Sequence, residues 1–412
     1  MTFGHTYSRA VSRGRRPPLT AMRLVVGFGV VSALADIVYE GARSVYGPFL
    51  ASLGATALVV SVVTGGGEAV ALVARLLFGR LADARARRWT LAIVGYGLTA
   101  LAVPLLGLTT ALWMAVVLIL LERLGKAVRS PAKDAMLAQA GTVTGRGWAF
   151  AIHEAMDQTG AFLGPLLIAA SLALTASFGP GLLLLAIPGI AAILVLVYLR
   201  RRVPDTSVFE PVDQTRPPDE LSREPLPRAL WIYAAFTALT MAGFATFGLL
   251  SFHLVEMGTV SVAIVPVVYA VAMGVDALAA LGSGRLYDRI GIRGLIVLPI
   301  LAAAIPWLGF SSSTAVVIAG MLIWGVVMGI QESTMRAAVA DLVPDARRGS
   351  AYGIFTAVYG LAWLAGSIII GVTYERSVVL SAVVVTVIQA GALIVFVVAR
   401  PHRHYGWAVQ RR

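Results

Sequence analysis

The sequence predicts an all-α membrane protein whose twelve transmembrane helices form two related six-helix bundles. Three observations lead to this prediction: the composition, the length of the apolar runs, and a repeat between the two halves of the chain. Of 412 residues, 58% are hydrophobic and only 13% are charged, with a mean hydropathy of +0.84. Soluble chains carry about 25% charged residues. The absence of cysteine excludes disulfides, thiolate metal sites and cysteine catalysis.

The apolar runs are long and continuous, as transmembrane helices require. A helix needs about 20 mostly apolar residues to cross the hydrocarbon layer, and it pairs its own backbone groups there. Strands of a membrane barrel would alternate apolar and polar residues instead. The predicted helices span residues 24–50, 57–80, 89–108, 111–138, 147–174, 180–200, 229–256, 260–284, 294–312, 314–341, 349–373 and 377–399.

One long polar segment, residues 201–228, divides the apolar part of the chain. It combines six prolines with mixed charges, which predicts a linker between two bundles. The first residues are basic but lack an apolar core followed by a cleavage site, so they are interpreted as a retained tail. The predicted organisation is a basic tail (1–23), an N-terminal bundle (24–200), a linker (201–228), a C-terminal bundle (229–399) and a second tail (400–412).

The net charge of +12 reflects membrane orientation and does not indicate nucleic-acid binding. If the amino terminus lies inside, all but six of the 33 basic residues fall in inside segments or at the inner ends of helices. This bias predicts that both termini are cytoplasmic. Arginine greatly outnumbers lysine, which suggests a high-GC bacterial genome. The expected location is the inner (plasma) membrane of a bacterium. The six exceptions are Arg376 in an outside loop, and Arg43, Arg75, Arg123, Lys126 and Arg336 within helices.

The two halves repeat each other at matching places. Residues 79–83 (GRLAD), after the second helix, match residues 284–288 (GRLYD), after the eighth. Residues 146–152 (RGWAFAI) match residues 348–354 (RGSAYGI). Two six-helix halves in the same orientation are a transporter architecture, with the binding site expected between them at mid-depth.

At these residues the chain resembles the major facilitator superfamily over essentially its whole length. The family's loop motif runs Gly-x3-Asp-Arg-x-Gly-Arg-Arg. The later copy is the closer one, with Gly284, Asp288, Arg289, Gly291 and Arg293. The earlier copy keeps Gly79, Asp83, Arg87 and Arg88, but has Ala84 and Ala86 where Arg and Gly are usual.

The resemblance implies a conformational switch at the inner ends of the helices. Each motif aspartate would cap the positive amino terminus of a helix in the other half, and would do so only while the inside is closed. Asp83 would meet the start of the eleventh helix near Gly349, and Asp288 the start of the fifth near Gly147. Asp134 would join the first network through Arg80 or Arg87. The expected switch residues are Gly79, Asp83, Arg87, Asp134, Gly284, Asp288 and Arg289. The alternative is that these are ordinary inside-loop charges.

The fifth helix carries Gly160-x3-Gly164-Pro165, which resembles the Gly-x3-Gly-Pro-x2-Gly-Gly motif of the superfamily's antiporters. The final glycine pair is absent, because Ile168 and Ala169 stand there. Small residues spaced by four let helices approach closely, so close packing is the simpler interpretation of the same pattern.

Several charges fall near the middle of predicted helices, where a charge costs several kcal/mol and is a functional hypothesis by default. Glu40 lies one turn beyond Asp36, beside Tyr39, and two neighbouring carboxylates at low dielectric do not ionise together easily. Arg123 is the expected counter-ion. The other central charges, about 15–18 Å deep at 1.5 Å per residue, are Glu122 and Asp157.

Carboxylates on the first helix with an arginine on the fourth resemble proton-coupled multidrug antiporters of the superfamily. Lys126 and Ala127 replace the Gln and Gly usual in the fourth-helix motif. The alternative is a static ion network that holds the N-terminal half together. On the fifth helix, His153 and Asp157 share a face, and with Asp36 they could bind a divalent metal. A proton-shuttle or hydrogen-bond role for His153 is the simpler expectation.

The C-terminal half has fewer central charges. Asp276, Glu332 and Arg336 lie nearer the inside, and the last two are expected to pair at i, i+4. Apolar residues at helical spacing could line this wall and favour an apolar or aromatic ligand, including a lipophilic cation, although such residues also serve as packing. They are Phe244, Phe247, Trp324, Met328, Tyr359 and Trp363, with the polar Gln331 among them.

The first hypothesis for function is therefore a proton-coupled exporter that works by alternating access. The expected proton-coupling residues are Asp36, Glu40, Glu122 and Asp157. The expected substrate-binding residues are Asp36, Tyr39, Arg123, His153, Phe244, Phe247, Trp324, Gln331 and Tyr359. The alternatives are a divalent-metal or small-metabolite carrier using Asp36, His153 and Asp157, and a non-transporting sensor. No nucleotide loop or hydrolase motif indicates an enzyme, and no cofactor is expected. The expected partners are a small-molecule substrate, protons and the lipid bilayer, and the expected state is a monomer.

Overall fold

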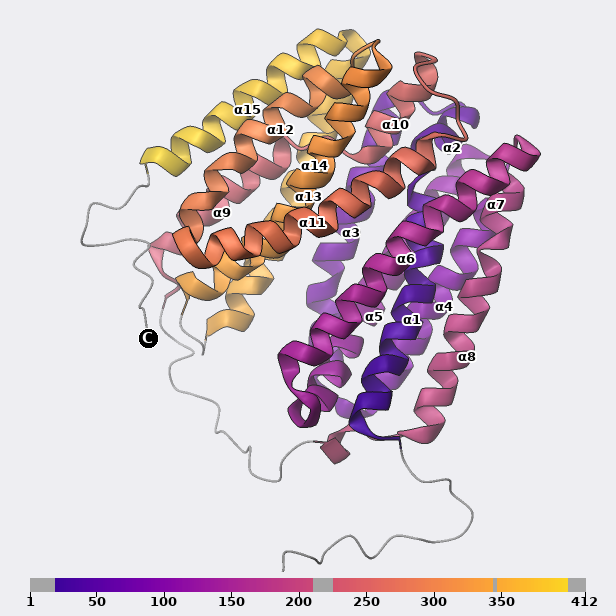
Figure 1. Ribbon diagram of the computed structural model, residues 1–412. Helices are drawn as coiled ribbons and strands as arrows, with labels where there is room; N and C mark the ends of the chain where they lie inside the picture. Colours follow the sequence, from indigo (N-terminus) through magenta and orange to yellow (C-terminus); the bar gives the residue numbers. More distant parts are fainter. Residues whose placement is uncertain (1–18, 210–224, 344–346, 399–412) are drawn as a thin grey trace, which may run out of the picture.

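The computed structural model describes residues 19–209, 225–343 and 347–398, and all regular elements within them are helices (Figure 1). The first half contains α1 (Ala21–Arg43), α2 (Tyr46–Ser52), α3 (Ala57–Ala82), η1 (Arg85–Arg87), α4 (Arg88–Leu106), α5 (Leu112–Thr144), α6 (Arg146–Thr175), α7 (Phe178–Leu184), α8 (Ala186–Arg202) and η2 (Thr206–Phe209). The second half contains α9 (Arg228–Ala242), α10 (Phe247–Glu256), α11 (Val265–Ile290), η4 (Gly291–Ile296), α12 (Val297–Gly309), α13 (Thr314–Leu342), α14 (Arg348–Arg376) and α15 (Val378–Val398).

The helices make twelve spans, and the predicted fold class is confirmed. Ten stretches of the described chain are long and apolar enough to cross a membrane. One of them, Val265–Gly309, contains both α11 and α12, which η4 joins at Gly291 with a positive φ of 62°. The remaining span is α5, which is absent from those ten stretches. Its first half carries Glu122, Arg123, Lys126 and Arg129, all of which the fold buries or half-buries.

The spans form two bundles that lie side by side, α1–α8 in one and α9–α15 in the other (Figure 1). We call one end of the molecule the basic end: there α1 and α9 begin, and α8 and α15 end. It carries arginine clusters such as Arg200–Arg202 in the last turn of α8. Exposed tryptophans lie near both ends, as in the aromatic belts of membrane proteins: Trp148 and Trp231 near the basic end, Trp113 and Trp307 near the opposite end.

Three predicted helices are each broken into two pieces. Proline cannot donate a backbone hydrogen bond to the residue four positions before it. Pro48 therefore leaves the carbonyl of Ser44 without its helical partner, where α1 gives way to α2. Pro188 does the same for Leu184, where α7 gives way to α8. The third break, residues 243–246, separates α9 from α10.

The helix α11 continues past the predicted end at residue 284. It runs to Ile290 and stops at Gly291, which has a positive φ. The second motif copy, residues 284–288, was expected after the helix but therefore lies within its last turns. In the first copy, Asp83 is the C-cap of α3. Part of the predicted linker is also ordered, because Thr142 on α5 donates to the carbonyl of Phe209 at 2.6 Å.

The two bundles are joined most closely at the end opposite the basic end. There Thr64 on α3 hydrogen-bonds Thr246 at 2.9 Å, and the backbone nitrogen of Leu58 donates to Glu375 on α14 at 2.9 Å. Gly47 on α2 lies against the backbone of Gly248 on α10. Toward the basic end, α5 and α6 diverge from α11 and α13 (Figure 1). The molecule is therefore closed at one end and more open at the other, where α3 and α14 nevertheless stay in contact near Leu76 and Gly353.

Candidate transport cavity

A cavity lies between the two bundles, and residues of both bundles line it. The N-terminal bundle contributes residues of α1, α3 and α5, and the C-terminal bundle contributes residues of α13 and α14. The lining residues of the first wall are Tyr39, Arg43, Glu68, Ala71, Leu72, Arg75, Lys126 and Ser130. Those of the second wall are Met328, Gln331, Glu332, Arg336, Phe355, Thr356, Tyr359 and Trp363.

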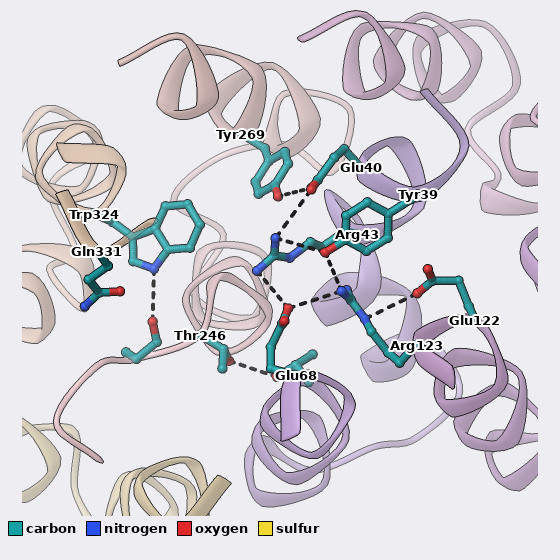
Figure 2. A network of polar contacts seen from close by, with 12 residues as sticks. Tyr39, Glu40, Arg43, Glu68, Glu122, Arg123, Thr246, Tyr269, Trp324 and Gln331 are labelled. Carbon is teal, nitrogen blue, oxygen red and sulfur yellow. Dashed lines mark hydrogen bonds and ion pairs between the residues drawn. The ribbon is translucent and has the colours of Figure 1, made fainter. Parts of the chain in front are cut away.

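The first wall is organised around Glu68, a buried carboxylate in the middle of α3. One of its oxygens lies 3.0 Å from a guanidinium nitrogen of Arg43 and 3.2 Å from one of Arg123 (Figure 2). Arg123 also lies 3.3 Å from Glu122 and donates a hydrogen bond to the Tyr39 hydroxyl. A Cβ at Gly67 would come within 2.9 Å of the Arg123 side chain, so this glycine leaves room for it.

The same network crosses from one bundle to the other. Arg43 lies 3.5 Å from Glu40, and Glu40 accepts a hydrogen bond from the Tyr269 hydroxyl of α11 (Figure 2). Tyr269 and Glu40 are both buried. A continuous chain of polar contacts thus runs from Glu122 on α5 through α3 and α1 to the C-terminal bundle. A change of charge in it can therefore affect how the bundles meet.

The second wall is aromatic and contains polar groups without partners. Phe355, Tyr359 and Trp363 lie along one helix, with ring centroids of neighbouring members 5.9 Å and 5.8 Å apart. The Tyr359 hydroxyl donates to the Gln331 side-chain oxygen at 3.3 Å. The side-chain amide nitrogen of Gln331 and the indole nitrogen of Trp363 are buried and have no hydrogen-bond partner among the described residues. Unpaired buried donors are costly, and a ligand reaches these two only when neighbouring side chains move.

A second polar cluster lies behind the first wall, inside the N-terminal bundle. His153 on α6 lies 3.4 Å from Asp157 and hydrogen-bonds Ser32 on α1 at 2.7 Å. A Cβ at Gly160 would come within 3.0 Å of the Asp36 Cβ. The glycine motif of α6 therefore packs directly on the part of α1 that carries Asp36, and brings Asp36 and Asp157 onto facing helices.

The structure divides the predicted substrate-binding residues into three groups. Tyr39, Gln331 and Tyr359 line the cavity. Arg123 and Phe247 line a smaller adjoining pocket, with Arg43, Tyr46, Thr64, Glu68, Thr246, Gly248 and Trp363. Asp36, His153, Phe244 and Trp324 line neither.

Trp324 and Phe244 have a different role from the one expected. The indole nitrogen of Trp324 donates to the carbonyl of Ala245 at 3.0 Å (Figure 2). Its ring stacks on Phe244, with the ring centroids 5.8 Å apart. Ala245 lies in the break between α9 and α10, where backbone groups lose their helical partners. In a membrane such groups must be satisfied within the protein. Trp324 thus stabilises the broken helix.

The switch residues are at the basic end, and Asp134 has a different partner from the one expected. Its carboxylate lies 2.5 Å from Arg75 on α3, which takes the place of Arg80 or Arg87. Arg75 is nearer the membrane centre, so this pair borders the cavity. Asp83 and Asp288 are exposed. In the described part of the chain neither contacts the start of the opposite helix, and the closed-state contact of each stays a prediction. Of the other expected switch residues, Gly79 lies in α3, Arg87 in η1, and Gly284 and Arg289 in α11.

Sequence reasoning missed Glu68 and Tyr269 and gave Arg43 no role. Glu68 interrupts the second apolar run, which is the same signal that singled out Asp36. Arg43 lies three residues beyond Glu40, a spacing at which helical side chains meet. Tyr269 carried no such signal, because a tyrosine in an apolar run is ordinary.

Two further expectations find no support in the described residues. Glu332 and Arg336 both line the cavity, and no ion pair joins them there. Within the same residues, no three His, Cys, Asp or Glu side chains are grouped so as to hold a metal ion. His153 and Asp157 do meet, yet without a third ligand.

Comparison with known proteins agrees with this architecture. A family model described as Major Facilitator Superfamily matches residues 28–367 and 259–406. The chain belongs to the Major Facilitator Superfamily. An uncharacterized protein of Mycobacterium tuberculosis is 51% identical over 387 residues, which cover 93% of this chain and 95% of that protein.

Solved transporters share the fold at low sequence identity. A mutant of the nucleoside transporter NupG matches with a TM-score of 0.72 at 15% identity, over 91% of this chain and 98% of that chain. A POT family transporter in complex with a thioalcohol-conjugated peptide matches with a TM-score of 0.74 at 13% identity, over 91% and 96%. The superfamily member described here is thus a multi-pass membrane transporter and not an enzyme, with a small-molecule substrate.

Proposed function

We propose that this transporter is a proton-coupled antiporter that exports a small amphipathic compound from a bacterial cell. The observation that carries the proposal is the packing of α6 on α1. Gly160 and Gly164, from the motif that resembles antiporters, bring Asp157 and Asp36 onto facing helices inside the membrane. Two carboxylates so placed gain from sharing a proton, since two neighbouring negative charges at low dielectric repel each other.

The position of these carboxylates supports coupling to the rest of the molecule. Asp36 lies one turn from Glu40, which binds Tyr269 of the C-terminal bundle. The helix that carries Asp157, α6, also packs against α11. Proton binding at Asp36 or Asp157 would therefore alter two of the helices that meet the other bundle, α1 and α6. This is the coupling that alternating access requires.

The character of the cavity supports an amphipathic substrate over a purely cationic one. Four cationic side chains line it, Arg43, Arg75, Lys126 and Arg336, against two carboxylates, Glu68 and Glu332. A lipophilic cation without an anionic group would meet net repulsion there. The aromatic second wall suits an apolar body. The metal-carrier alternative is not proposed, because His153 and Asp157 lack a third ligand among the described residues.

The arrangement in the membrane is also a proposal. The arginine-rich basic end is placed in the cytoplasm by the positive-inside rule, together with both termini. The cavity would then be closed toward the outside. We propose a monomer as the working unit, because the lining residues of the cavity all come from one chain.

Asp36→Asn tests the coupling. Compounds that raise the unfolding temperature of the purified protein are first identified, and each is then added to proteoliposomes that contain a pH-sensitive dye. We expect an active compound to drive protons in the direction opposite to its own, and we expect Asp36→Asn to abolish this proton flux while the protein stays folded. Glu256→Gln, at the exposed end of α10 and away from the cavity, is the matched control. Unaltered flux in Asp36→Asn, or protons that move with the compound, would contradict the proposal.

A further inference from the structure

Two opposite charges on facing walls of the cavity are left without partners. On the first wall, the Lys126 ammonium forms no ion pair or hydrogen bond within the described residues, and lies 4.0 Å from the centre of the Tyr39 ring. On the second wall, Glu332 is exposed to the cavity and unpaired in the same part of the chain. The other charges of the first wall are already neutralised, Arg43 by Glu68 and Arg75 by Asp134. Arg336, beside Glu332 on the second wall, also has no ion pair among the described residues. Lys126 on the first wall, and Glu332 and Arg336 on the second, are therefore the charges left for a ligand.

The two unsatisfied donors of the cavity lie on the second wall. The amide nitrogen of Gln331 and the indole nitrogen of Trp363 are buried and without acceptors among the described residues. Both residues line the cavity, so a ligand can supply the missing acceptor once side-chain shifts uncover these two nitrogens. A carboxylate supplies such acceptors and also a charge for Lys126.

We propose that the substrate is a zwitterion with an aromatic or apolar body, whose anionic group binds Lys126 and whose ammonium group binds Glu332. Its body would lie between the Tyr39 ring and the rings of Phe355 and Tyr359. A zwitterion can pair with both Lys126 and Glu332, whereas a singly charged ligand pairs with only one of them. Because Lys126 and Glu332 belong to different bundles, one such molecule would bridge the bundles.

This inference rests on the proposed exchange function and specifies the chemical class of the exchanged substrate. An ammonium group and a proton would compete for Glu332, and competition for one site is what exchange requires. The charged groups around Glu332 are Arg336 on its own helix, Asp276 on α11, Lys126 on α5, Glu154 on α6 and Arg43 on α1. Among these, Lys126 is the one on the opposite wall that has no partner of its own.

The test compares ligands that differ only in charge. Phenylalanine and the dipeptide alanyl-phenylalanine are the zwitterions, phenylalaninamide and phenethylamine carry only the ammonium, and N-acetylphenylalanine and 3-phenylpropanoate carry only the carboxylate. The measurement is the shift of the unfolding temperature of the purified full chain, which rises when a ligand binds the folded protein. No proton gradient is present, so failure here leaves the proteoliposome test of coupling unaffected.

We expect a zwitterion to stabilise the wild type at concentrations at least tenfold below those of its singly charged analogues. Lys126→Gln should remove the advantage over the cations, and Glu332→Gln the advantage over the anions. Lys133→Gln and Glu256→Gln do not touch the cavity lining and should keep both advantages. The proposal is overturned if zwitterions shift the temperature no more than singly charged analogues do, or if either lining variant retains the full pattern.

Discussion

At the scale of single residues, Glu68 determines how the charges of the first wall are held. Its carboxylate lies within 3.2 Å of both Arg43 and Arg123, and Arg123 is only 2% exposed. Taking an arginine out of water is costly unless an opposite charge accompanies it. Glu40 and Glu122 add a further carboxylate to each arginine, at 3.5 Å and 3.3 Å. The network is thus a structural part of the N-terminal bundle as well as a wall of the cavity.

Glu68→Gln should destabilise the protein by about 3 kcal/mol, the lower part of the range for breaking a buried ion pair. The reason is that two buried guanidinium groups would lose a shared counter-ion while the side-chain volume stays the same. The measurement is the free energy of unfolding, or the unfolding temperature, of the purified protein. Glu154→Gln, an exposed residue that hydrogen-bonds only Gln158 among the described residues, is the matched control. Equal stability of the two variants would show that the network is not needed for folding.

At the scale of elements, helix breaks and helix ends position several of the residues that are expected to take part in transport. The break between α9 and α10 presents Ala245 to Trp324, and the break after α1 lets α2 turn toward α10. The last turns of α3 and α11 carry the two motif copies, with Asp83 and Asp288 exposed at the basic end. In this structure the basic end of α11 diverges from that of α6 (Figure 1), so Asp288 is expected to reach its partner only after closure. The helices α3 and α14 stay in contact near Leu76 and Gly353, and the contact expected of Asp83 stays a prediction.

Asp288→Ala should favour the state that is open at the basic end. A carboxylate at a helix amino terminus contributes about 0.3–1 kcal/mol, which corresponds to a two- to fivefold change in population. Since the chain has no cysteine, Thr356→Cys places a single thiol in the cavity. We expect its labelling by a water-soluble maleimide to speed up by that factor in the Asp288→Ala background.

The matched control for this measurement is Asp205→Ala, since Asp205 lies outside both bundles, in the segment between α8 and η2. Labelling rates that are the same with and without Asp288 would count against a switch role. They would leave Asp288 as an ordinary charge of the inside loop.

At the scale of the whole molecule, the two bundles meet through glycines at the end opposite the basic end. A Cβ at Gly47 would come within 2.8 Å of the backbone nitrogen of Phe252, closer than real atoms approach. The closure therefore depends on the absence of a side chain at this position. Alternating access requires that this contact separates when the basic end closes.

Gly47→Val should force the bundles apart at this end. We expect slower labelling of Thr356→Cys, because the cavity would close toward the basic end. Labelling of a second reporter, Thr64→Cys at the separated contact, should become faster. Gly274→Val is the matched control, since a Cβ at Gly274 would meet no atom within 4 Å. If both reporters behave alike in the two valine variants, the bundles do not alternate about this contact.

The sequence by itself determined the fold class, the twelve spans and the repeat. Membrane helices satisfy their own backbone, so length and hydropathy suffice to locate them, and α5 was found despite the four charges of its first half. A charge in an apolar run is also visible without a structure, and Asp36, Glu122, Arg123 and Asp157 were singled out in this way. The helix breaks were not predicted where a proline leaves the carbonyl four residues earlier without its helical hydrogen bond, as Pro48 does for Ser44.

Only the tertiary structure decided which of these residues act together. Tyr39 and Arg43 lie on the face of α1 that lines the cavity, and Asp36 lies on the face that packs against α6, although all three lie within two turns of one another. The partner of Arg123 proved to be Glu68, more than fifty positions away, since helix packing brings α3 and α5 together. Depth in the membrane follows from position along a helix, which the sequence contains. The direction that a side chain faces follows from how helices pack, which depends on contacts between distant residues.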